Sequence, residues 1–413
     1  MMKKPVSVLV LGAGSRGRAY ADYSLTHPDD MRIAAVAEPV EERREAFRKK
    51  YSVPSSMCFS SWSDALDKGR IADAVFICTL DGMHTEPALK AIDLCYDILL
   101  EKPMSNREEE CRAIVEAAEK KGVHITVCHV LRYTPFFRTI KQCITSGLIG
   151  DVCVVNLREN VCYWHQAHSF VRGNWRNSSE TSPMILQKSC HDMDILLYLI
   201  GRRCLRLSSF GSLKFFTAEN APEGSAERCL DCSVRNECPY DACRLYLGEN
   251  TEWPVDVISD DLSLEGRRKA LREGPYGRCV FHCDNTVVDR QSVNLEFEDG
   301  IVATFTMTAF TSDHTRELKI MGTKGQLVCS MDKESIVYTD FLTETERVIP
   351  LVNLHTDTFG HGGGDYLIVK EFLESIDGKE GESLSSPRVS LESHLMCFAA
   401  ERSRLNKGEV VEL

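Results

Sequence analysis

A chain of 413 residues, 43% of them hydrophobic, is long enough for two or three domains and apolar enough for a sizeable core, which excludes an intrinsically disordered protein. Acidic residues outnumber basic ones by 61 to 49, and the net charge of −12 argues against a nucleic acid or an anionic membrane as the main partner. The apolar run Val6–Leu11 is too short for a secretory signal or a membrane span. We therefore expect a cytoplasmic protein whose 18 cysteines are mostly reduced.

The first part of the chain alternates between strand and helix patterns. Apolar, β-branched runs predict strands at residues 6–11, 32–38, 72–79, 97–101 and 124–130. Helical patterns lie between them, at residues 16–25, 39–50, 84–93 and 107–121. Strands of this kind suit a parallel sheet that is covered on both faces. We predict a doubly wound Rossmann domain over residues 1–126.

The pattern changes from about Asp151. Apolar and polar residues alternate in period two over residues 151–160, 291–300, 301–310, 316–325 and 326–332. Gly300, Gly322 and Gly325 punctuate these runs, as hairpin turns require. Helical runs close the chain at 365–376 and 391–405. Residues 127–413 are therefore predicted to form an α+β domain with a large, mostly antiparallel open sheet, interrupted by a cysteine-rich insertion at about 218–288.

A glycine-rich turn follows the first predicted strand. Gly12, Gly14 and Gly17 have the G-x-G-x-x-G spacing, which permits a tight turn, close approach of a pyrophosphate and close packing of a helix on a strand. Glu38 ends the second strand, where a carboxylate can accept a hydrogen bond from a ribose 2′-hydroxyl and would repel a 2′-phosphate. This favours NAD over NADP, although Arg43 and Arg44 lie nearby in the sequence. The residues predicted to bind the cofactor here are Gly12, Ala13, Gly14, Ser15, Arg16, Gly17 and Glu38. The alternative is a doubly wound domain that binds no nucleotide.

Several longer motifs carry a family resemblance. They are CTLDGMHTEPALKAI (78–92), ILLEKPMS (98–105), LRYTPFF (131–137), LIGDV (148–152), HGGGDYLIVKEF (361–372) and SLESHLMCFAAERSR (390–404). Together with the glycine turn, they resemble the glucose–fructose oxidoreductase / inositol dehydrogenase / MocA family. The resemblance implies a Rossmann domain, a second α/β domain, NAD(P), a sugar or cyclitol substrate, and homo-oligomers formed through the open sheets.

The resemblance also implies roles for individual residues. Lys102 of the Glu-Lys-Pro signature would lie beside the nicotinamide, and Thr79 and His84 would flank the cofactor cleft. Glu101 joins the expected cofactor-binding set together with Lys102.

Charged side chains occur in the otherwise apolar stretch ILQKSCHDMDILLYLIG (185–201). The family pattern here is D-x-x-x-H-x-x-D, with the histidine in proton transfer. His191 and Asp194 match its last two positions, and Gln187 replaces the first Asp. On one continuous helix, Lys188, His191 and Asp192 would share a face.

The oxidation of a carbinol requires a positioned base that accepts the hydroxyl proton. We predict that His191 is this acceptor and that Lys102 orients the hydroxyl. Lys188 would do part of the work of the missing Asp, and Asp192 or Asp194 would hold the His191 ring. The alternative is an interdomain ion-pair network, Lys188 with Asp192, without a catalytic role.

Further polar residues are candidates for binding the substrate. The run YWHQAHSFVRGNWRN (163–177) supplies aromatic faces for a sugar and polar groups for its hydroxyls, and HGGGD (361–365) places glycines at a helix start. The predicted substrate residues are His165, His168, Trp175, Arg176, Asp192 and His361. The alternatives are an ordinary polar loop and a simple helix cap.

Six cysteines fall in the irregular segment. Cys229, Cys232 and Cys238 have C-x2-C-x5-C spacing, and they are predicted to hold a structural zinc with Cys283 as the fourth ligand. Cys243 and Cys279 compete for the fourth position. An iron–sulfur cluster uses the same ligands and stays open, as does a set of unligated reduced thiols.

These patterns predict an NAD-dependent oxidoreductase that transfers a hydride at a ring carbinol of a sugar or sugar derivative. The alternative is an NAD-dependent glycosidase that oxidises a hydroxyl transiently, eliminates the glycoside and returns the hydride. The two share one cofactor site, so the motifs do not separate them. A cofactor-bound regulator is a third possibility, against which the presence of Lys102 and His191 weighs.

Overall fold

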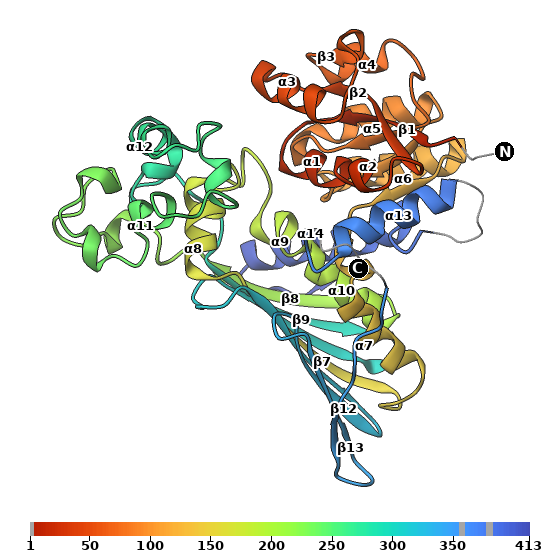
Figure 1. The fold of residues 1–413 in the computed structure, drawn as a ribbon. Coiled ribbons are helices and arrows are strands. Elements are labelled where there is room, and N and C mark those ends of the chain that lie inside the picture. The colour runs from red at the N-terminus through yellow and green to blue at the C-terminus, as the bar shows by residue number, and fades with distance from the viewer. Residues whose placement is uncertain (1–3, 355–359, 377–382) are drawn as a thin grey trace.

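The computed structural model describes residues 4–354, 360–376 and 383–413, which build two sheets (Figure 1). The first sheet has the order β3-β2-β1-β4-β5-β6, and all of its pairings are parallel. Its strands are β1 Val6–Leu11, β2 Met31–Ala37, β3 Cys58–Phe59, β4 Ala74–Ile77, β5 Asp97–Leu100 and β6 Ile125–Val127. Its helices are α1 Ser15–Ala21, α2 Tyr23–Thr26, α3 Glu41–Lys50, α4 Trp62–Leu66, α5 Thr85–Asp93 and α6 Glu108–Lys121. This strand order is that of a dinucleotide-binding fold, as predicted.

The second sheet has nine strands in the order β14-β13-β12-β11-β7-β10-β9-β8-β15. The pair β7–β10 is parallel, and the other pairings are antiparallel. The strands are β7 Val152–Asn160, β8 Cys204–Ser212, β9 Arg290–Phe297, β10 Val302–Thr308, β11 Thr315–Gly322, β12 Gly325–Ser330, β13 Ser335–Asp340, β14 Glu346–Val348 and β15 Val411–Glu412. The predicted mostly antiparallel sheet is confirmed.

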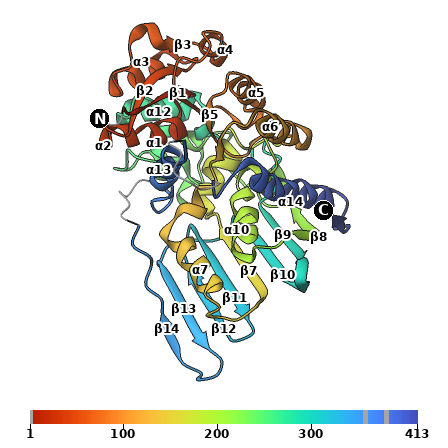
Figure 2. The ribbon, with the colours of Figure 1, turned by 90° about the vertical axis from the view of Figure 1, so that its right-hand side faces the viewer.

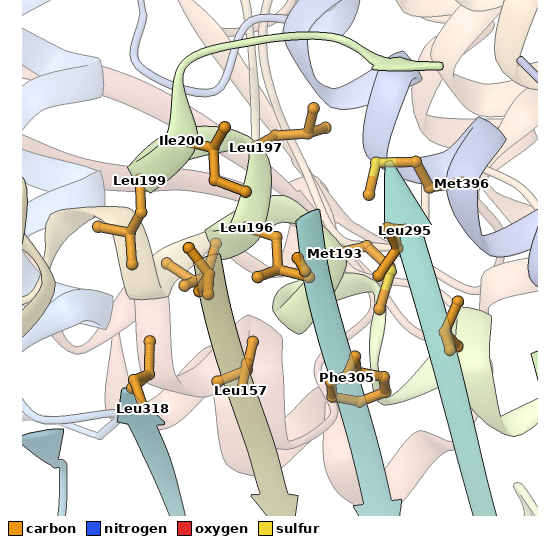
Figure 3. Packing of buried hydrophobic residues seen from close by; sticks show 14 of the residues in the cluster. Leu157, Met193, Leu196, Leu197, Leu199, Ile200, Leu295, Phe305, Leu318 and Met396 are labelled. Atoms are coloured by element: carbon orange, nitrogen blue, oxygen red, sulfur yellow. The ribbon is translucent and has the colours of Figure 1, made fainter. Parts of the chain in front are cut away.

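Helices cover one face of this open sheet (Figure 2). They are α7 Pro135–Thr145, α10 Cys190–Ile200 and α14 Pro387–Leu405. Leu196 of α10 is fully buried and packs in one apolar cluster with Leu157 of β7 and Phe305 of β10 (Figure 3). Burial alternates along β9 and β10, as a sheet that is covered on one face requires. None of the helices that the structure describes is long and apolar enough to cross a membrane.

Helix α13, Gly364–Ile376, packs against the first sheet although it follows the second in the chain. Its Ile368 and Phe372 join the same apolar cluster as Val8 and Phe76 of the parallel strands. The rings of Phe76 and Phe372 meet edge to face with centroids 5.8 Å apart. The Rossmann core is therefore completed by a late segment of the chain.

The insertion lies to one side of the two sheets, at the left of Figure 1. Its helices are α11 Ala242–Tyr246 and α12 Leu264–Glu273, and short 3₁₀ turns connect them. A small apolar cluster that includes Tyr246, Val255 and Leu271 holds it together. The helices α8 Tyr163–His165 and α9 Met184–Gln187 and a π-helical turn, Gln166–Arg172, lie between β7 and α10 in the chain.

Candidate active site

The register of the parallel strands brings the predicted cofactor loops together. Leu11 at the end of β1 pairs with Ala37 on β2 and with Ile77 on β4. Ile77 in turn pairs with Leu100 on β5. The glycine turn, Glu38, Thr79 and the Glu-Lys-Pro signature all follow these strands directly. They therefore lie along one edge of the sheet, where such folds bind dinucleotides.

The glycine turn has the shape that a nucleotide needs. Gly12 has φ +95°, and a Cβ atom there would stand 2.5 Å from the carbonyl oxygen of Cys78. A Cβ atom on Gly17 would stand 2.0 Å from the carbonyl oxygen of Gly12. At Gly14 the space within 4 Å is open, so a pyrophosphate can approach the backbone at the start of α1. Gly12 thus permits the tight turn, Gly14 leaves room for the pyrophosphate, and Gly17 lets α1 pack closely against the turn.

Glu38 is buried beside this turn. Its two carboxylate oxygens accept hydrogen bonds from the amides of Ala13, at 2.8 Å, and Val40, at 3.1 Å. Each carboxylate oxygen can accept a second hydrogen bond. The carboxylate is therefore held rigidly at the end of β2 and keeps capacity for a ribose hydroxyl. Arg44 donates to the carbonyl oxygen of Glu38 at 2.6 Å.

Arg16 links the glycine turn to two other segments. It donates to Glu101 at 2.8 Å and to Asp365 of α13 at 2.6 and 3.0 Å, and the hydroxyl of Tyr20 also contacts Glu101 at 2.6 Å. Burial works to raise the pKa of both carboxyl groups, but Arg16 acts together with Lys102 and Tyr20 at Glu101, and with His361 at Asp365, and the net result is a lowered pKa for both. Arg16 and Glu101, predicted as cofactor-binding residues, thus also hold the cleft together.

His84 supports the loop that carries Lys102. Its ring nitrogens lie 2.7 Å from the carbonyl oxygen of Pro103 and 3.0 Å from that of Thr79. His84 is buried, so it positions two loops of the cleft, whereas Thr79 is partly exposed at its edge.

Lys102 and His191 lie close enough for the charge of Lys102 to act on the His191 ring. Lys102 donates through Nζ to the carbonyl oxygen of Gln187 at 2.7 Å. The His191 ring lies 5.9 Å from that of His129 and 6.1 Å from that of His361. Among the described residues, His191 Nδ1 has no hydrogen-bond partner. Burial and the charge of Lys102 lower the pKa of His191 well below its ordinary value, so the ring is neutral near pH 7.

The expectation that Asp192 or Asp194 holds the His191 ring is wrong. Asp194 accepts two hydrogen bonds from Arg132, each of 2.7 Å. Asp192 accepts one from Arg316 at 2.7 Å and is fully buried, so it is also unsuited to the predicted contact with substrate. Both carboxylates therefore stabilise arginines in the core.

Lys188 does not share a helix with His191. Helix α9 ends at Gln187 and α10 begins at Cys190, so the expected single helical face does not form. Lys188 pairs with Glu159 of β7 at 3.2 Å, and Arg316 joins Glu159, at 2.9 Å, to Asp192. This buried network resembles the structural alternative, with Glu159 in place of Asp192 as the direct partner. Burial lowers the pKa of Lys188, and Glu159 opposes that shift.

Replacing Lys188 with methionine is expected to lower the free energy of unfolding by about 3–5 kcal/mol, because it leaves Glu159 and Asp192 to share one arginine in a buried place. Urea denaturation followed by tryptophan fluorescence measures this. Turnover of the folded variant at low temperature should stay near normal. The matched change Lys90→Met removes a partly exposed lysine and should cost at most about 1 kcal/mol. Reduced turnover with unchanged stability would instead show that Lys188 is catalytic.

Two of the other predicted substrate residues, His165 and His168, contact the insertion. His165 contacts His314 with ring centroids 4.6 Å apart, and it lies 5.0 Å from the ring of Trp253 in the insertion. His168 bonds to the hydroxyl of Tyr246 at 2.8 Å, so it anchors the insertion.

Arg176 is likewise occupied, because it makes two hydrogen bonds to Asp284. Trp175 is 38% exposed. His361 is exposed, with φ +54°, and its Nδ1 lies 3.1 Å from Asp365. Trp175 and His361 are therefore the predicted residues whose side chains stay exposed to a substrate, whereas His165 is buried beside Trp253.

Trp253 was missed by the sequence patterns. It is 42% exposed and packs against Trp164, His165 and His168. The insertion that carries it also approaches α1. Burial raises the pKa of Asp256, and the charge of Arg18 opposes this rise. An aromatic face of this kind is suited to packing against the C–H face of a sugar.

The prediction of a zinc site is not supported. Within residues 4–354, 360–376 and 383–413, no group of three or more His, Cys, Asp or Glu residues is placed to hold a metal ion. Cys283, the predicted fourth ligand, places its Sγ 3.2 Å from the carbonyl oxygen of Cys279.

Comparisons with known proteins agree with the fold and with the predicted NAD-binding domain. The model of the oxidoreductase family with an NAD-binding Rossmann fold matches residues 6–129, and that of the family's C-terminal alpha/beta domain matches residues 141–413. The chain therefore belongs to the glucose–fructose oxidoreductase / inositol dehydrogenase / MocA family of NAD(P)-dependent oxidoreductases.

Individual relatives are distant. YteT of Bacillus subtilis (strain 168), named as an oxidoreductase, is 25% identical over 83% of this chain and 82% of its own. Inositol 2-dehydrogenase of Corynebacterium glutamicum (strain R) is 26% identical over 49% of this chain and 56% of its own. The 2,7-anhydro-N-acetylneuraminate hydratase of Escherichia coli (strain K12) is 26% identical over 46% of this chain and 49% of its own.

Solved structures share the whole architecture. The WlbA dehydrogenase of Chromobacterium violaceum, in complex with NADH and UDP-GlcNAcA, has a TM-score of 0.69 at 15% identity, covering 100% of this chain and 97% of its own. The aldose–aldose oxidoreductase of Caulobacter crescentus has a TM-score of 0.70 at 14% identity, covering 99% and 100%. At these identities the likeness shows the fold alone.

Proposed function

We propose that this protein is an NAD-dependent oxidoreductase that transfers a hydride at a ring carbinol of a sugar or sugar derivative. The observation that carries the proposal is the electrostatic effect of Lys102 on the neutral ring of His191. Lys102 follows the parallel strand β5, and Gln187 of the second domain fixes its ammonium. His191 has a lowered pKa and a buried ring nitrogen that has no hydrogen-bond partner among the residues that the structure describes. A cation and a neutral base in one place suit the removal of a hydroxyl proton.

In this proposal, NAD and the residues of the chain have the following roles in the reaction. Bound NAD would accept the hydride from the carbinol carbon. Lys102 donates a hydrogen bond to the reacting hydroxyl and stabilises the negative charge that develops on its oxygen. His191 accepts the hydroxyl proton. Trp253, with His165 beside it, packs against the sugar ring and holds the reacting carbon in place.

A panel of sugars, cyclitols and glycosides incubated with NAD tests this proposal. The expected result is release of one NADH for each sugar oxidised. Failure of every compound to reduce NAD, with the cofactor shown to bind, would contradict it.

A second candidate is a glycosidase or lyase that works through transient oxidation. Two relatives named 2,7-anhydro-N-acetylneuraminate hydratase, from Escherichia coli and Mediterraneibacter gnavus, favour it. In that reaction a ketone formed on the sugar would acidify the neighbouring carbon, whose proton is lost as the glycosidic oxygen leaves. Water would then add to the double bond that the elimination leaves, and the hydride would return to the ketone carbon. Product formation without net NADH, with NAD retained through turnover, would distinguish this reaction from the first.

Preference for NAD over NADP is the expected result of titrating the protein with both cofactors by intrinsic fluorescence. The reason is the fixed carboxylate of Glu38, which would repel a 2′-phosphate. Glu38 is held by two backbone amides, so it cannot swing away. Equal or stronger binding of NADP would show that Arg43 or Arg44 outweighs this repulsion.

We also propose a homo-oligomer, a dimer or tetramer through the second sheet, in the cytoplasm. The support is the set of exposed apolar side chains on this sheet, among them Phe210 (58% exposed), Val302 (46%) and Val328 (45%). The mass in solution measured by light scattering tests it, and a monomer at high concentration would contradict it.

A further inference from the structure

Four histidines from separate parts of the chain lie close together around the proposed substrate site. The ring centroids of His165 and His314 are 4.6 Å apart, and those of His191 and His361 are 6.1 Å apart. The charge of His361 acts on both His191 and His314, which joins the two pairs into one group. The reaction proposed above uses His191 as the base and places His165 beside the sugar ring. It gives no role to His314.

His314 is open to a ligand. Its side chain is exposed just before β11 begins at Thr315. Desolvation by the surrounding protein and the charge of Lys188 nevertheless lower the pKa of His314 to about 4. A side chain that is both exposed and partly desolvated faces a recess of the protein. The neighbouring Asp313 accepts a hydrogen bond from Asn160 at 2.6 Å.

The carboxylate inside this group is buried and already bound to cations. Glu159 pairs with Lys188 at 3.2 Å and with Arg316 at 2.9 Å. The side chain of Lys188 is 14% exposed and that of Glu159 is 0% exposed, so the ammonium lies on the accessible side of this pair. In the described part of the chain, only His361 of the four histidines is paired with a carboxylate, that of Asp365. The group therefore presents imidazole and ammonium nitrogens to a ligand.

The charges around the histidines favour an anion. Burial and the charge of Lys188 lower the pKa of both His165 and His314, and burial and Lys102 do the same to His191. A bound anion would offset the two ammonium charges and stabilise the protonated rings, whereas a neutral sugar would not. His165 and His191 each have a buried Nδ1 without a hydrogen-bond partner among the described residues.

A carboxylate fits this group better than a phosphate does. Phosphate recognition typically uses the fork of an arginine. Arg316 is taken up by Glu159 and Asp192, and Arg176 makes two hydrogen bonds to Asp284. A carboxylate carries a single charge on two oxygens, which a few N–H donors can satisfy.

We propose that the substrate is an acidic sugar, such as a uronic acid or a glycoside of one, and that His314, supported by His165, binds its carboxylate. Trp253, whose ring lies 5.0 Å from that of His165, packs against the sugar ring beside the bound carboxylate. Lys102 and His191 act on the carbinol. This inference rests on the proposed function, because it names the substrate class of the same site.

Matched pairs of compounds test the substrate class. Glucuronate, galacturonate and methyl glucuronide are compared with glucose, galactose and methyl glucoside in the presence of NAD, and glucose 6-phosphate serves as the phosphate probe. An acid that is oxidised should have a kcat/KM about 10–100-fold above that of its neutral partner, which corresponds to one hydrogen bond to a charged group. Equal or faster oxidation of the neutral sugars, or a preference for the phosphate, would overturn the inference and leave the proposed oxidoreductase in place.

Binding measurements separate this inference from the proposed function. The protein loaded with NADH is titrated with the same compounds, and the change in NADH fluorescence gives their affinities. The acids should bind at least about tenfold more tightly than their neutral partners. Tight binding of an acid without any reduction of NAD would contradict the oxidoreductase and retain the acidic ligand. Failure of every acid to bind the loaded protein would overturn the inference.

His314→Ala tests the assignment of the carboxylate to this histidine. It should lower the affinity for an acid about tenfold more than the affinity for its neutral partner, because only the acid loses a hydrogen bond between charged groups. His27→Ala, near α2, should leave this ratio unchanged. NAD titration shows whether each variant is folded.

His314→Glu gives a second comparison at the same exposed position. It places a negative charge beside the bound carboxylate, so the preference for the acid should fall further than in His314→Ala. This variant also serves should His314→Ala lose NAD binding. A ratio of acid to neutral affinity that stays at the wild-type value in a folded His314 variant would overturn the assignment.

Discussion

Replacing Lys102 with methionine is expected to lower kcat by about 10²–10⁴-fold and to leave the affinity for NAD nearly unchanged. Methionine has a similar length and volume but carries neither charge nor donor. The ammonium of Lys102 is held 2.7 Å from the Gln187 carbonyl, which places it at the junction of the two domains. Steady-state kinetics with the sugar that the panel identifies measures kcat, and fluorescence titration measures NAD binding.

The control is Lys90→Met, which removes a partly exposed lysine on α5 that pairs with Asp67. It should leave kcat and the affinity for NAD unchanged. A Lys102→Met enzyme with the wild-type kcat would exclude Lys102 from the chemistry, and one that lost NAD binding as well would assign it to the cofactor instead.

His191→Ala is expected to lower kcat by a similar factor of about 10²–10⁴, because the variant lacks the group that accepts the hydroxyl proton. The pH dependence gives a second readout. Burial and Lys102 lower the pKa of His191 below 6.5, so the neutral, proton-accepting form persists as the pH falls through 6.5. The wild-type rate should therefore stay high at pH 6 and fall only at lower pH.

In His191→Ala this acidic limb should disappear along with most of the rate. His27→Ala changes a histidine near α2, away from the cleft, and should retain both the rate and its pH profile. A wild-type rate that already halves at pH 6.5 or above would show that His191 does not have a lowered pKa in the working enzyme, or that another group accepts the proton.

The fold was predictable where the pattern was local and strong. The apolar run of β1, the glycine turn and the period-two alternation of β9 and β10 each specify an element without help from distant residues. Strand β8, Cys204–Ser212, escaped prediction because serines and a glycine weaken its alternation. Its strand geometry comes from pairing with β9 along its whole length.

The site was predictable only in part. Lys102 and His191 were found because they belong to motifs that the family shares. Glu159, the partner of Lys188, and Arg316, the partner of Asp192, lie on strands 157 residues apart, so no spacing could reveal them (316 − 159 = 157). The helical-face argument for Lys188 failed because the chain turns at Lys188 and Ser189, where no glycine or proline signals a break.

The cysteine pattern shows the same limit. The C-x2-C-x5-C spacing of Cys229, Cys232 and Cys238 is a local signal, but it does not show whether their sulfurs converge on one point. Such convergence is a tertiary property, and in the part of the chain that the structure describes no group of three or more metal-ligating side chains is placed to hold a metal ion.

The packing of α13 in the first domain has a consequence for how the protein is made. A ribosome finishes the six strands of the Rossmann sheet at Val127, but Phe372 and Asp365 are about 240 residues away (365 − 127 = 238). Until they emerge, the face of the sheet around Phe76 is uncovered and Arg16 lacks one of its carboxylates. The first domain to be synthesised is thus among the last to mature, and a nascent or truncated chain that stops before α13 presents an apolar surface to chaperones and proteases.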